Sequence, residues 1–303
     1  MRRILICGSN GLLGQKLALM LSSQTDYEVL NTSIERSFVF DSRLFDYTQL
    51  DIAKKGDVKS LISSFHPTVI LNAAAATNVD WCEVNREEAW KINVVGIENL
   101  VEAARKVGAR LVHISTDYVF DGSHGPYSED DKPNPISYYG KSKLASENAV
   151  RSGAIPYTIL RSMILYGSGI GLKDSFPVWV IKSLRAGQRI RCVDDQIGNP
   201  THVSDLAFTV TKSFELNRDG IYHVCGKDRV SRYDFALQIA ETFNLDRSLV
   251  LRIRTGDLKQ EAPRPLSSGL ITLKAQTELG LNPMSIEQGL ALLKREIMEA
   301  GRN

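Results

Sequence analysis

The feature that most constrains the fold is a glycine-rich turn between a short apolar segment and an amphipathic segment at the start of the chain. Residues 3–7 (RILIC) have the character of a buried strand, and residues 12–23 carry apolar side chains at helical spacing. Gly8, Gly11 and Gly14 allow the backbone to turn sharply and to approach a pyrophosphate, which the free N–H groups of a helix N-terminus attract. We therefore expect a dinucleotide-binding site here rather than a strand-to-helix turn without a ligand.

The alternation of apolar runs and amphipathic segments continues to about residue 162. Continuous apolar strands that alternate with helices are typical of a parallel sheet covered on both faces. With right-handed crossovers, the expected fold is α/β, a Rossmann-type doubly wound parallel sheet. The expected strands are 28–32, 68–73, 110–115 and 157–162, and the expected helices are 57–65, 87–107 and 136–151.

Beyond this point glycine and proline recur, and the alternation becomes irregular. We expect residues 1–162 to form the dinucleotide-binding domain, and residues 163–202 and 221–303 to form a smaller C-terminal substrate-binding lobe. Residues 203–220, which begin with a helical pattern, are expected to return to the first domain. The elements expected in the lobe are a strand at 221–225 and helices at 231–243 and 285–300.

The charge balance and the spacing of cysteine and histidine exclude several classes of protein. With 37 basic and 35 acidic residues the net charge is +2, which does not suit a protein that neutralises many nucleic-acid phosphates. The cysteines lie far apart and the histidines show no ligand spacing, so we expect neither disulfides nor a bound metal. No apolar run has the length of a membrane span. We expect a cytoplasmic protein with no membrane or nucleic-acid partner.

The end of the second expected strand bears on the choice of cofactor. NAD sites usually place an acidic residue there to bind the ribose diol, but this strand ends with Thr32 and Ser33, and Arg36 follows. Hydroxyls with an arginine suit a 2′-phosphate, which favours NADPH. Glu35 keeps NADH open, because a small shift of the loop would bring its carboxylate to the ribose. Arg36 could also be a solvated loop charge.

Tyr139 and Lys143 begin a predicted helix and share one of its faces. A unit charge ~4 Å from a phenol, at an effective dielectric of ~20, is worth about 4 kcal/mol, which lowers the phenol pKa by roughly three units. Thr116 ends a preceding strand, where the sites of parallel sheets lie. We therefore expect Thr116 to hold a carbonyl oxygen, Tyr139 to donate a proton to it, and Lys143 to lower the Tyr139 pKa. Small residues at 73–75, after another strand, leave room for a flat cofactor.

These motifs resemble those of the extended short-chain dehydrogenases/reductases, and more closely those of the dTDP-4-dehydrorhamnose reductase family of sugar-nucleotide reductases. The resemblance runs through nearly the whole chain. Its most specific motifs are STDYVFDG at 115–122, YGKSK at 139–143 and DQIGNPT at 195–201. The other matching segments are GSNGLLG at 8–14, DI at 51–52, NAAA at 72–75, VDWCE at 79–83, INV at 92–94, PYSE at 126–129 and RPLSSGL at 264–270.

On the cofactor side, the resemblance implies further roles. Asp51 and Ile52 would meet the adenine, and Asn93 would stand where the superfamily keeps a supporting asparagine. Lys143 would also bind the nicotinamide ribose. The residues that would line the pyrophosphate or flank the dinucleotide are Gly8, Asn10, Gly11, Leu12, Leu13, Gly14, Ala73, Ala74 and Ala75.

On the substrate side, the resemblance implies that Thr77, Val79 and Thr116 approach the sugar and that Arg264 closes the nucleotide-sugar pocket. Reductases of this family commonly carry RTSWxY where this chain has RSMILY, so Ile164 stands in place of a tryptophan that would contact the sugar. This difference leaves the identity of the sugar open, but not the hydride chemistry. Some family members bind magnesium between subunits; no matching carboxylates are found here, and no metal is expected.

The resemblance implies NADPH-dependent reduction of the 4-keto group of a nucleotide-linked deoxy-sugar, with dTDP-4-dehydrorhamnose as the expected substrate. Three alternatives stay open. The first is another sugar-nucleotide reductase, or an epimerase or dehydratase that keeps NAD bound. The second is a non-catalytic NADP-binding subunit that resembles the regulatory subunit of methionine adenosyltransferase. The third, a nucleic-acid-binding role, is disfavoured by the near-neutral charge. A homodimer through the last helix is open as well.

Overall fold

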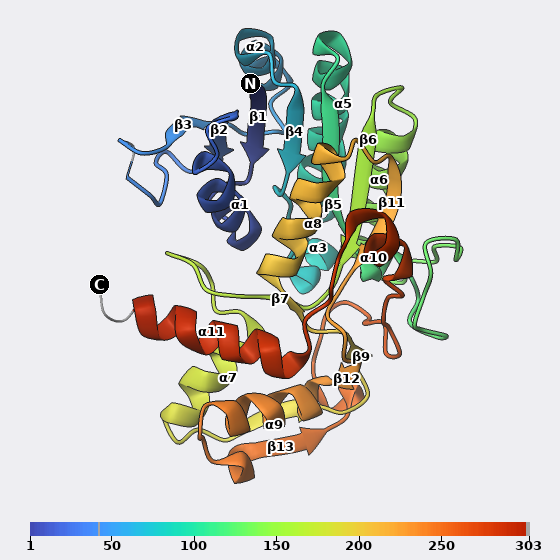
Figure 1. The fold of residues 1–303 in the computed structure, drawn as a ribbon. Helices are drawn as coiled ribbons and strands as arrows, with labels where there is room; N and C mark the ends of the chain where they lie inside the picture. The colour runs from blue at the N-terminus through green and yellow to red at the C-terminus, as the bar shows by residue number, and fades with distance from the viewer. Residues whose placement is uncertain (42, 301–303) are drawn as a thin grey trace.

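Seven strands form the central sheet of the computed structural model, which describes residues 1–41 and 43–300 (Figure 1). They are β1 (Arg2–Cys7), β2 (Tyr27–Ser33), β3 (Asp46–Gln49), β4 (Val69–Asn72), β5 (Arg110–Thr116), β6 (Tyr157–Ser162) and β11 (Gly220–Val224). The neighbouring strands all pair in parallel, in the order β11-β6-β5-β4-β1-β2-β3. The strand order reverses beside β1, which confirms the expected doubly wound Rossmann-type fold.

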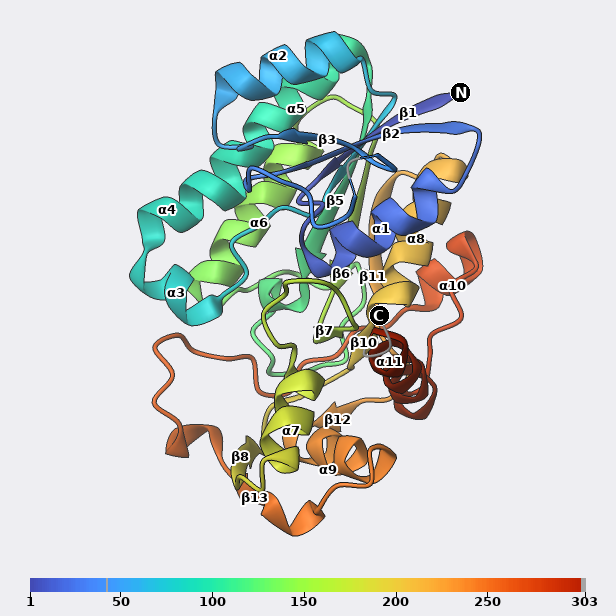
Figure 2. The same cartoon turned by 90° about the vertical axis from the view of Figure 1, so that its left-hand side faces the viewer.

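Helices cover both faces of this sheet (Figure 2). They are α1 (Leu12–Ser22), α2 (Lys55–Phe65), α3 (Val79–Val84), α4 (Arg86–Trp90), α5 (Gly96–Val107), α6 (Tyr138–Arg151) and α8 (Val203–Glu215). One core joins the sheet to α1 and α8 through residues such as Leu17 and Leu206. The other core joins the opposite face to α2, α5 and α6 through Ile62, Leu100 and Val150. Burial on both faces is the reason why central strands such as β1 and β4 are continuous apolar runs.

A smaller lobe lies beyond the carboxyl ends of the strands (Figure 1). Its helices are α7 (Phe176–Arg185), α9 (Arg232–Thr242) and α11 (Ile286–Ala300). Its strands pair as β7 (Leu165–Tyr166) with β10 (Thr201–His202), β8 (Ile190–Val193) with β13 (Val250–Ile253), and β9 (Ile197–Gly198) with β12 (Val230–Ser231). Tyr166, Phe235 and Leu290 belong to its separate apolar core. The lobe therefore packs around its own centre rather than on the sheet.

The expected division of the chain is wrong for the strand at 221–225. This strand is β11, which pairs with β6 at the edge of the central sheet and not within the lobe. α8 leads directly into it, because a helix packed on the sheet returns the chain to the next free strand edge. The short helix α10 (Leu273–Leu279) also packs on the domain side, where Ala275 and Leu279 join the α1–α8 core.

The structure also differs from the expected elements elsewhere. The helix expected at 87–107 is divided into α4 and α5 by a π-helical stretch, Lys91–Val95. The exposed strand β3 was not expected, because its residues (DYTQ) form no apolar run. α7 was not expected either. Pro177, one of the prolines of this irregular part of the sequence, lies in the first turn of α7, where its missing N–H is not needed.

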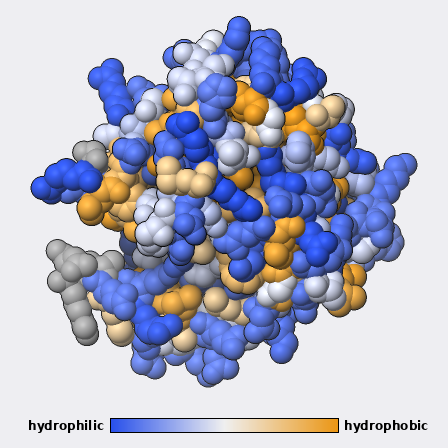
Figure 3. Space-filling model, turned by 45° about the horizontal axis from the view of Figure 1, so that its top comes forward, coloured by the Kyte–Doolittle hydropathy of each residue, from blue (hydrophilic) through white to orange (hydrophobic). Residues whose placement is uncertain are grey.

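The surface carries no broad apolar band on the face shown in Figure 3, where hydrophobic residues are scattered among hydrophilic ones. Among residues 1–41 and 43–300, no helix has both the length and the apolar character needed to cross a bilayer.

Candidate active site

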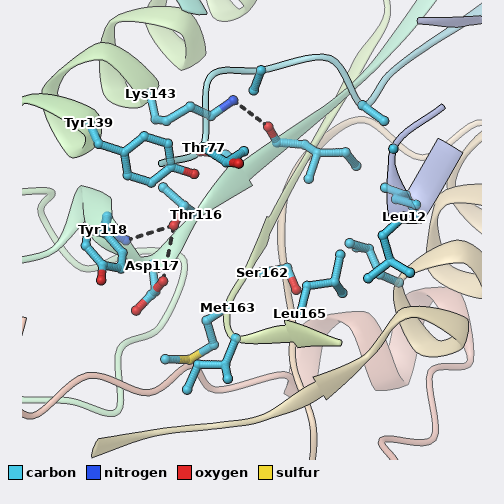
Figure 4. A pocket seen from close by; sticks show the side chains of 18 of the residues that line it. Leu12, Thr77, Thr116, Asp117, Tyr118, Tyr139, Lys143, Ser162, Met163 and Leu165 are labelled. Atoms are coloured by element: carbon cyan, nitrogen blue, oxygen red, sulfur yellow. Dashed lines mark hydrogen bonds between the residues drawn. The ribbon is translucent and has the colours of Figure 1, made fainter. Parts of the chain in front are cut away.

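A cavity of about 540 Å³ opens at the carboxyl ends of the central strands, between the sheet and the lobe (Figure 4). This is where ligands bind in open parallel sheets. It brings together the phosphate loop, the segment after β4, the end of β5, the start of α6 and the segment after β6. The predicted site residues that line it are Gly11, Leu12, Leu13, Gly14, Ala73, Ala74, Ala75, Thr77, Val79, Thr116, Tyr139, Lys143 and Ile164.

The phosphate loop is built for close backbone approach. Gly8 has φ +81°, and a Cβ there would lie 2.7 Å from the backbone nitrogen of Ala74. A Cβ at Gly14 would lie 2.2 Å from the carbonyl oxygen of Gly8, so α1 can begin this close to β1 only with glycine. Gly11, at the N-cap of α1, has no side chain to cap the first-turn N–H groups. The residues of this first turn line the cavity, and the uncapped N–H groups of a helix N-terminus suit a pyrophosphate.

Asn10, which the resemblance placed along the pyrophosphate, does not line the cavity. Its amide instead holds the loop after β2: it accepts from Val39 N at 3.1 Å, and it donates to Ser37 O at 3.0 Å and to Glu35 Oε2 at 3.2 Å. The Ser33 hydroxyl also donates to the Glu35 carboxylate. A carboxylate therefore stands at the end of β2, the position where an acidic residue would bind a ribose diol.

Of the three residues expected to favour a 2′-phosphate, two form hydrogen bonds within the protein and one is exposed. Thr32 is buried, and its hydroxyl donates to the Ile6 carbonyl at 2.9 Å, so it is used within the sheet. Ser33 is bound to Glu35, and Arg36 is exposed. Of these residues, Arg36 is the one whose charge remains accessible to a phosphate.

The two residues expected at the adenine lie outside the cavity. Asp51 accepts a hydrogen bond from Ala53 N at 3.0 Å in the turn before α2. The Ile52 side chain is buried, and a Cβ on Gly96 would lie 2.8 Å from it. Their side chains thus have structural roles in this structure.

Thr116, Tyr139 and Lys143 do come together on one side of the cavity, as expected (Figure 4). Thr116 ends β5, and its hydroxyl donates to Asp117 Oδ1 at 3.1 Å and accepts from Tyr118 N at 3.2 Å. α6 begins where the Ser137 hydroxyl accepts from the backbone N–H of the third residue after it. The glycine of YGKSK is needed because a Cβ at position 140 would lie 2.1 Å from the Tyr118 carbonyl oxygen.

The electrostatics of this group differ from the expectation for Tyr139. Burial raises the pKa of the Tyr139 phenol, and the Thr116 hydroxyl offsets only part of this rise. Burial lowers the pKa of Lys143 to about 8, against the opposing charge of Glu147. The Lys143 ammonium donates to the Ile114 carbonyl at 2.7 Å rather than to the phenol. Without a bound ligand, Lys143 is therefore directed away from the group whose pKa it was expected to lower.

His113 lies beneath Lys143 as a core residue, in line with its position on a buried strand. Its Nδ1 is 3.1 Å from the Asn72 amide nitrogen, and its Nε2 is 2.9 Å from the Ser146 hydroxyl. Burial, and then the charge of Lys143, lower the pKa of His113 well below its usual value. A neutral imidazole therefore packs against the Lys143 ammonium, with its Nε2 3.3 Å from Lys143 Nζ.

Asn93 acts through the backbone rather than by lining the cavity. It lies in the π-helical stretch and is buried. Its amide accepts from Ala76 N at 2.8 Å and donates to Ala76 O at 3.1 Å and to the Ser142 hydroxyl at 3.0 Å. It therefore fixes the segment that follows the three alanines against α6.

The residues expected at the sugar divide into two groups. Thr77, Val79 and Ile164 line the cavity. Ile164 has φ +45°, a region that β-branched residues rarely adopt, and its carbonyl accepts from Thr201 N at 3.1 Å. Arg264 is not brought into the cavity: its guanidinium donates to Asp80 Oδ2 and to the Ala262 carbonyl, each at 2.8 Å.

Two cationic residues of the lobe line the cavity without having been expected there. Arg232 begins α9, and its guanidinium lies 5.3 Å from the centre of the Phe176 ring. Burial lowers the pKa of Arg232. Lys173, in the segment before α7, lines the same cavity. Arg232 follows the two-residue strand β12, which was not expected from the sequence, and Lys173 lies in a loop. Neither belongs to a motif, so no local signal identified them.

No cluster of three histidine, cysteine, aspartate or glutamate side chains placed to hold a metal ion occurs in the described part of the chain. The fold and the cavity together define an α/β protein of the dinucleotide-binding class, in which Thr116, Tyr139 and Lys143 line one cavity with the glycine-rich loop. The chain belongs to the RmlD family, since the family model described as RmlD substrate binding domain matches residues 1–298.

Two curated proteins and one solved structure are similar to this chain over most of its length. The dTDP-4-dehydrorhamnose reductase of Aggregatibacter actinomycetemcomitans is 35% identical over 302 residues, covering 96% of this chain and 97% of that protein. The structure of dTDP-4-dehydrorhamnose reductase from Bacillus anthracis in complex with NADP is 33% identical, with a TM-score of 0.85, covering 99% of this chain and 100% of that one. Methionine adenosyltransferase 2 subunit beta of Xenopus laevis is 34% identical over 270 residues, covering 87% of this chain and 78% of that protein.

Proposed function

We propose that this protein reduces the 4-keto group of a nucleotide-linked deoxy-sugar with NADPH, and that dTDP-4-dehydrorhamnose is its substrate. The observation that carries the proposal is the single cavity that joins the phosphate loop to the hydroxyls of Thr116 and Tyr139 and to Lys143. The dTDP-4-dehydrorhamnose reductase of Bacillus anthracis, to which this chain is similar, has been solved in complex with NADP. The chain therefore has a place for the cofactor and, beside it, groups that can polarise and protonate a carbonyl oxygen.

The residues present fit a dinucleotide. The N–H groups after Gly11 would bind the pyrophosphate, and Ala73, Ala74 and Ala75 leave a flat wall beside it. Lys143 would bind the nicotinamide ribose. When bound, the reduced nicotinamide supplies the hydride. Arg36 would meet a 2′-phosphate, whereas Glu35 would accept from a ribose diol, so the chain carries groups for both NADPH and NADH.

Tyr139 would supply the proton that the new alcohol requires. Because burial raises its pKa, the phenol stays protonated across the neutral range and can act as the acid. Thr116 would donate a hydrogen bond from its hydroxyl to the same oxygen, and so stabilise the negative charge that develops on it. The net reaction adds hydride to the carbonyl carbon and a proton to the oxygen, and solvent returns the proton to Tyr139.

The lobe side of the cavity suits a nucleotide sugar. Arg232 and Lys173 place positive charge there, as a diphosphate requires. The Ser162 hydroxyl lines the cavity and has no hydrogen-bond partner within the described residues, so it is available to a sugar hydroxyl. Met163 and Ile164 add an apolar wall, which fits the methyl group of a 6-deoxy sugar.

The decisive experiment follows NADPH oxidation with dTDP-4-keto-6-deoxyhexose generated in situ, with NADH in parallel. Loss of absorbance that is abolished in Tyr139→Phe supports the proposal. If only GDP- or UDP-linked keto sugars are reduced, the reaction stands, but dTDP-4-dehydrorhamnose is not the substrate. Tight NADPH binding with no keto sugar reduced would contradict the proposal and favour a non-catalytic role, which the similarity to methionine adenosyltransferase 2 subunit beta keeps in view.

A further inference from the structure

A fully buried carboxylate lies one helical turn beyond Lys143, outside the cavity lining. Glu147 on α6 has no exposed surface, and Arg161 on β6 is 2% exposed. The Arg161 guanidinium donates to Glu147 through Nε at 2.9 Å and Nη2 at 2.7 Å. The Ser115 hydroxyl on β5 donates to the same carboxylate at 2.5 Å. One carboxylate therefore joins α6 to both β5 and β6.

Each of these elements carries residues of the candidate site. Ser115 and Arg161 are direct partners in the parallel pairing of β5 and β6. The residue after each of them, Thr116 and Ser162, lines the cavity. On the helix, positions 139, 143 and 147 are successive residues of one face. Glu147 is therefore placed to hold the end of β5 against the helix face that carries the phenol and the ammonium.

Stability alone does not explain this buried ion pair. Taking two charges out of water is expensive, and an apolar pair of similar size is often as stable or more so. Apolar and polar groups both surround the pair: the Arg161 guanidinium lies 5.1 Å from the centre of the fully buried Phe120 ring, and its Nη1 lies 3.4 Å from His223 Nε2. The charge of Glu147 can instead act on Lys143, which lies one helical turn away on α6.

We propose that Glu147 is a positioning residue for the reduction: its carboxylate fixes Thr116 relative to Tyr139, and its charge acts on the Lys143 ammonium one helical turn away. The proposal rests on the proposed function, because it assigns Glu147 a part in that reaction. Glu147 does not touch the cavity, so it acts through Ser115, through Arg161 and through its charge.

The charge of Glu147 opposes the effect of burial on the Lys143 pKa, which is about 8. The histidines nearby do not interfere: burial lowers the pKa values of His113 on β5 and of His223 on β11, the latter to about 3.

The other titratable groups around the ion pair also do not account for a loss of activity on the alkaline side of the pH profile. Burial raises the pKa of Asp117, after β5, but a carboxyl loses its proton on the acidic side of the profile. Burial raises the pKa of Tyr139, on α6 itself, which keeps its titration above that of Lys143. Loss of activity or binding near pH 8 and above therefore reports Lys143.

The test compares Glu147→Gln with Glu147→Asp. Glu147→Gln removes the charge; we expect kcat to fall at least tenfold and the alkaline limb of the kcat–pH profile to move to lower pH. Glu147→Asp keeps the charge but shortens its reach, so kcat falls while the alkaline limb stays near that of the wild type. Glu98→Gln, an exposed glutamate on α5, is the matched control and should change neither.

A purely structural role gives a different pattern. Glu147→Gln would then lower thermal stability and yield, while the folded fraction would keep the wild-type alkaline limb; that result overturns the proposal. If Glu147→Gln does not fold, Glu147→Met combined with Arg161→Met replaces both charges by apolar side chains of similar length. We expect this variant to bind NADPH and to turn over slowly; wild-type kcat and pH profile in it would refute the role of Glu147.

The pH dependence of NADPH binding, followed by fluorescence, separates this proposal from the proposed function. This measurement reports the protonation of Lys143 without turnover. The pH at which NADPH affinity is lost on the alkaline side, the binding limb, should also be lower in Glu147→Gln than in the wild type. If the wild type binds NADPH but reduces no keto sugar, the proposed function fails, and the binding limb alone supports or refutes the effect of Glu147 on Lys143. If the wild type does not bind NADPH, both proposals fail.

Discussion

The guanidinium of Arg264 donates a 2.8 Å hydrogen bond to Asp80, joining a loop of the lobe to the first turn of α3. Asp80 also accepts from Ala262 N at 3.1 Å, so its carboxylate holds the loop at two points. Arg264 is only 9% exposed in this pair, whereas Asp80 is 39% exposed. Since Val79, which precedes Asp80, lines the cavity, this ion pair ties the loop of the lobe to the wall of the cavity.

Arg264→Gln should therefore weaken substrate binding without affecting the cofactor. We expect the KM for the keto sugar nucleotide to rise several-fold and the Kd for NADPH to stay within twofold. A double-mutant cycle with Asp80→Asn should give a coupling of about 1 kcal/mol in the free energy of unfolding. Arg247→Gln, which breaks an exposed ion pair of the lobe, is the control. Equal losses of NADPH and sugar affinity would show that the pair stabilises the whole fold instead.

Tyr139→Phe should bind NADPH as the wild type does and lose most of its turnover. A positioned general acid contributes roughly 10²–10⁴ in rate, so kcat should fall by a factor in this range. Tyr157→Phe, a change of the same kind at the start of β6, serves as the control. Steady-state kinetics with a fluorescence titration of NADPH measure both effects. Normal turnover in Tyr139→Phe would refute its assignment as proton donor.

Gly14→Ala should abolish NADPH binding and destabilise the protein. The new methyl group would lie 2.2 Å from the Gly8 carbonyl oxygen and 2.5 Å from Ser9 Cα, so the loop must shift. Gly56→Ala, in α2, meets no atom within 4 Å and should raise the free energy of unfolding by up to about 1 kcal/mol. Urea unfolding and NADPH titration of both variants test this. NADPH binding that survives in Gly14→Ala would mean that the glycine spacing is not what admits the cofactor.

Glu35→Gln should shift cofactor preference toward NADPH. The Glu35 carboxylate, held by Asn10 and Ser33, would repel a 2′-phosphate and accept from a ribose diol. We expect the ratio of kcat/KM for NADPH to that for NADH to rise about tenfold, which corresponds to about 1.4 kcal/mol. Arg36→Gln should move the same ratio in the opposite direction. If both variants leave the ratio unchanged, the loop after β2 does not select the cofactor.

Lys143→Met should change how stability depends on pH. Burial lowers the Lys143 pKa from 10.5 to about 8, so between these values the unfolded chain binds a proton that the folded protein does not. The contribution of Lys143 to the free energy of unfolding is therefore least favourable below pH 8 and rises toward pH 10.5, by up to about 3 kcal/mol.

Lys143→Met lacks this contribution. Its free energy of unfolding should therefore exceed that of the wild type most below pH 8, and the difference should shrink as the pH rises. Lys59→Met, on the exposed face of α2, is the control. Urea unfolding at several pH values measures the difference. Parallel curves for Lys143→Met and the wild type would contradict the lowered pKa.

Much of the fold and the centre of the site follow from local patterns in the sequence. A parallel strand buried on both faces needs a continuous apolar run, and a helix needs an apolar stripe, so most strands and helices were predictable. The glycine spacing at Gly8, Gly11 and Gly14 and the four-residue spacing of Tyr139 and Lys143 are also local. Because parallel strands end at one edge of the sheet, Thr116 could be placed beside them.

Only the tertiary structure decided the groups whose partners lie far away in the chain. Asn10 is bound to the loop after β2 rather than exposed to a pyrophosphate, and Arg264 is bound to Asp80 rather than to a ligand. Arg232 enters the cavity from the lobe, and Glu147 meets Arg161 across α6 and β6. No periodicity encodes such contacts, because they depend on how separately formed elements pack. A side chain bound to a distant partner and one free for a ligand look the same in the sequence until that packing is known.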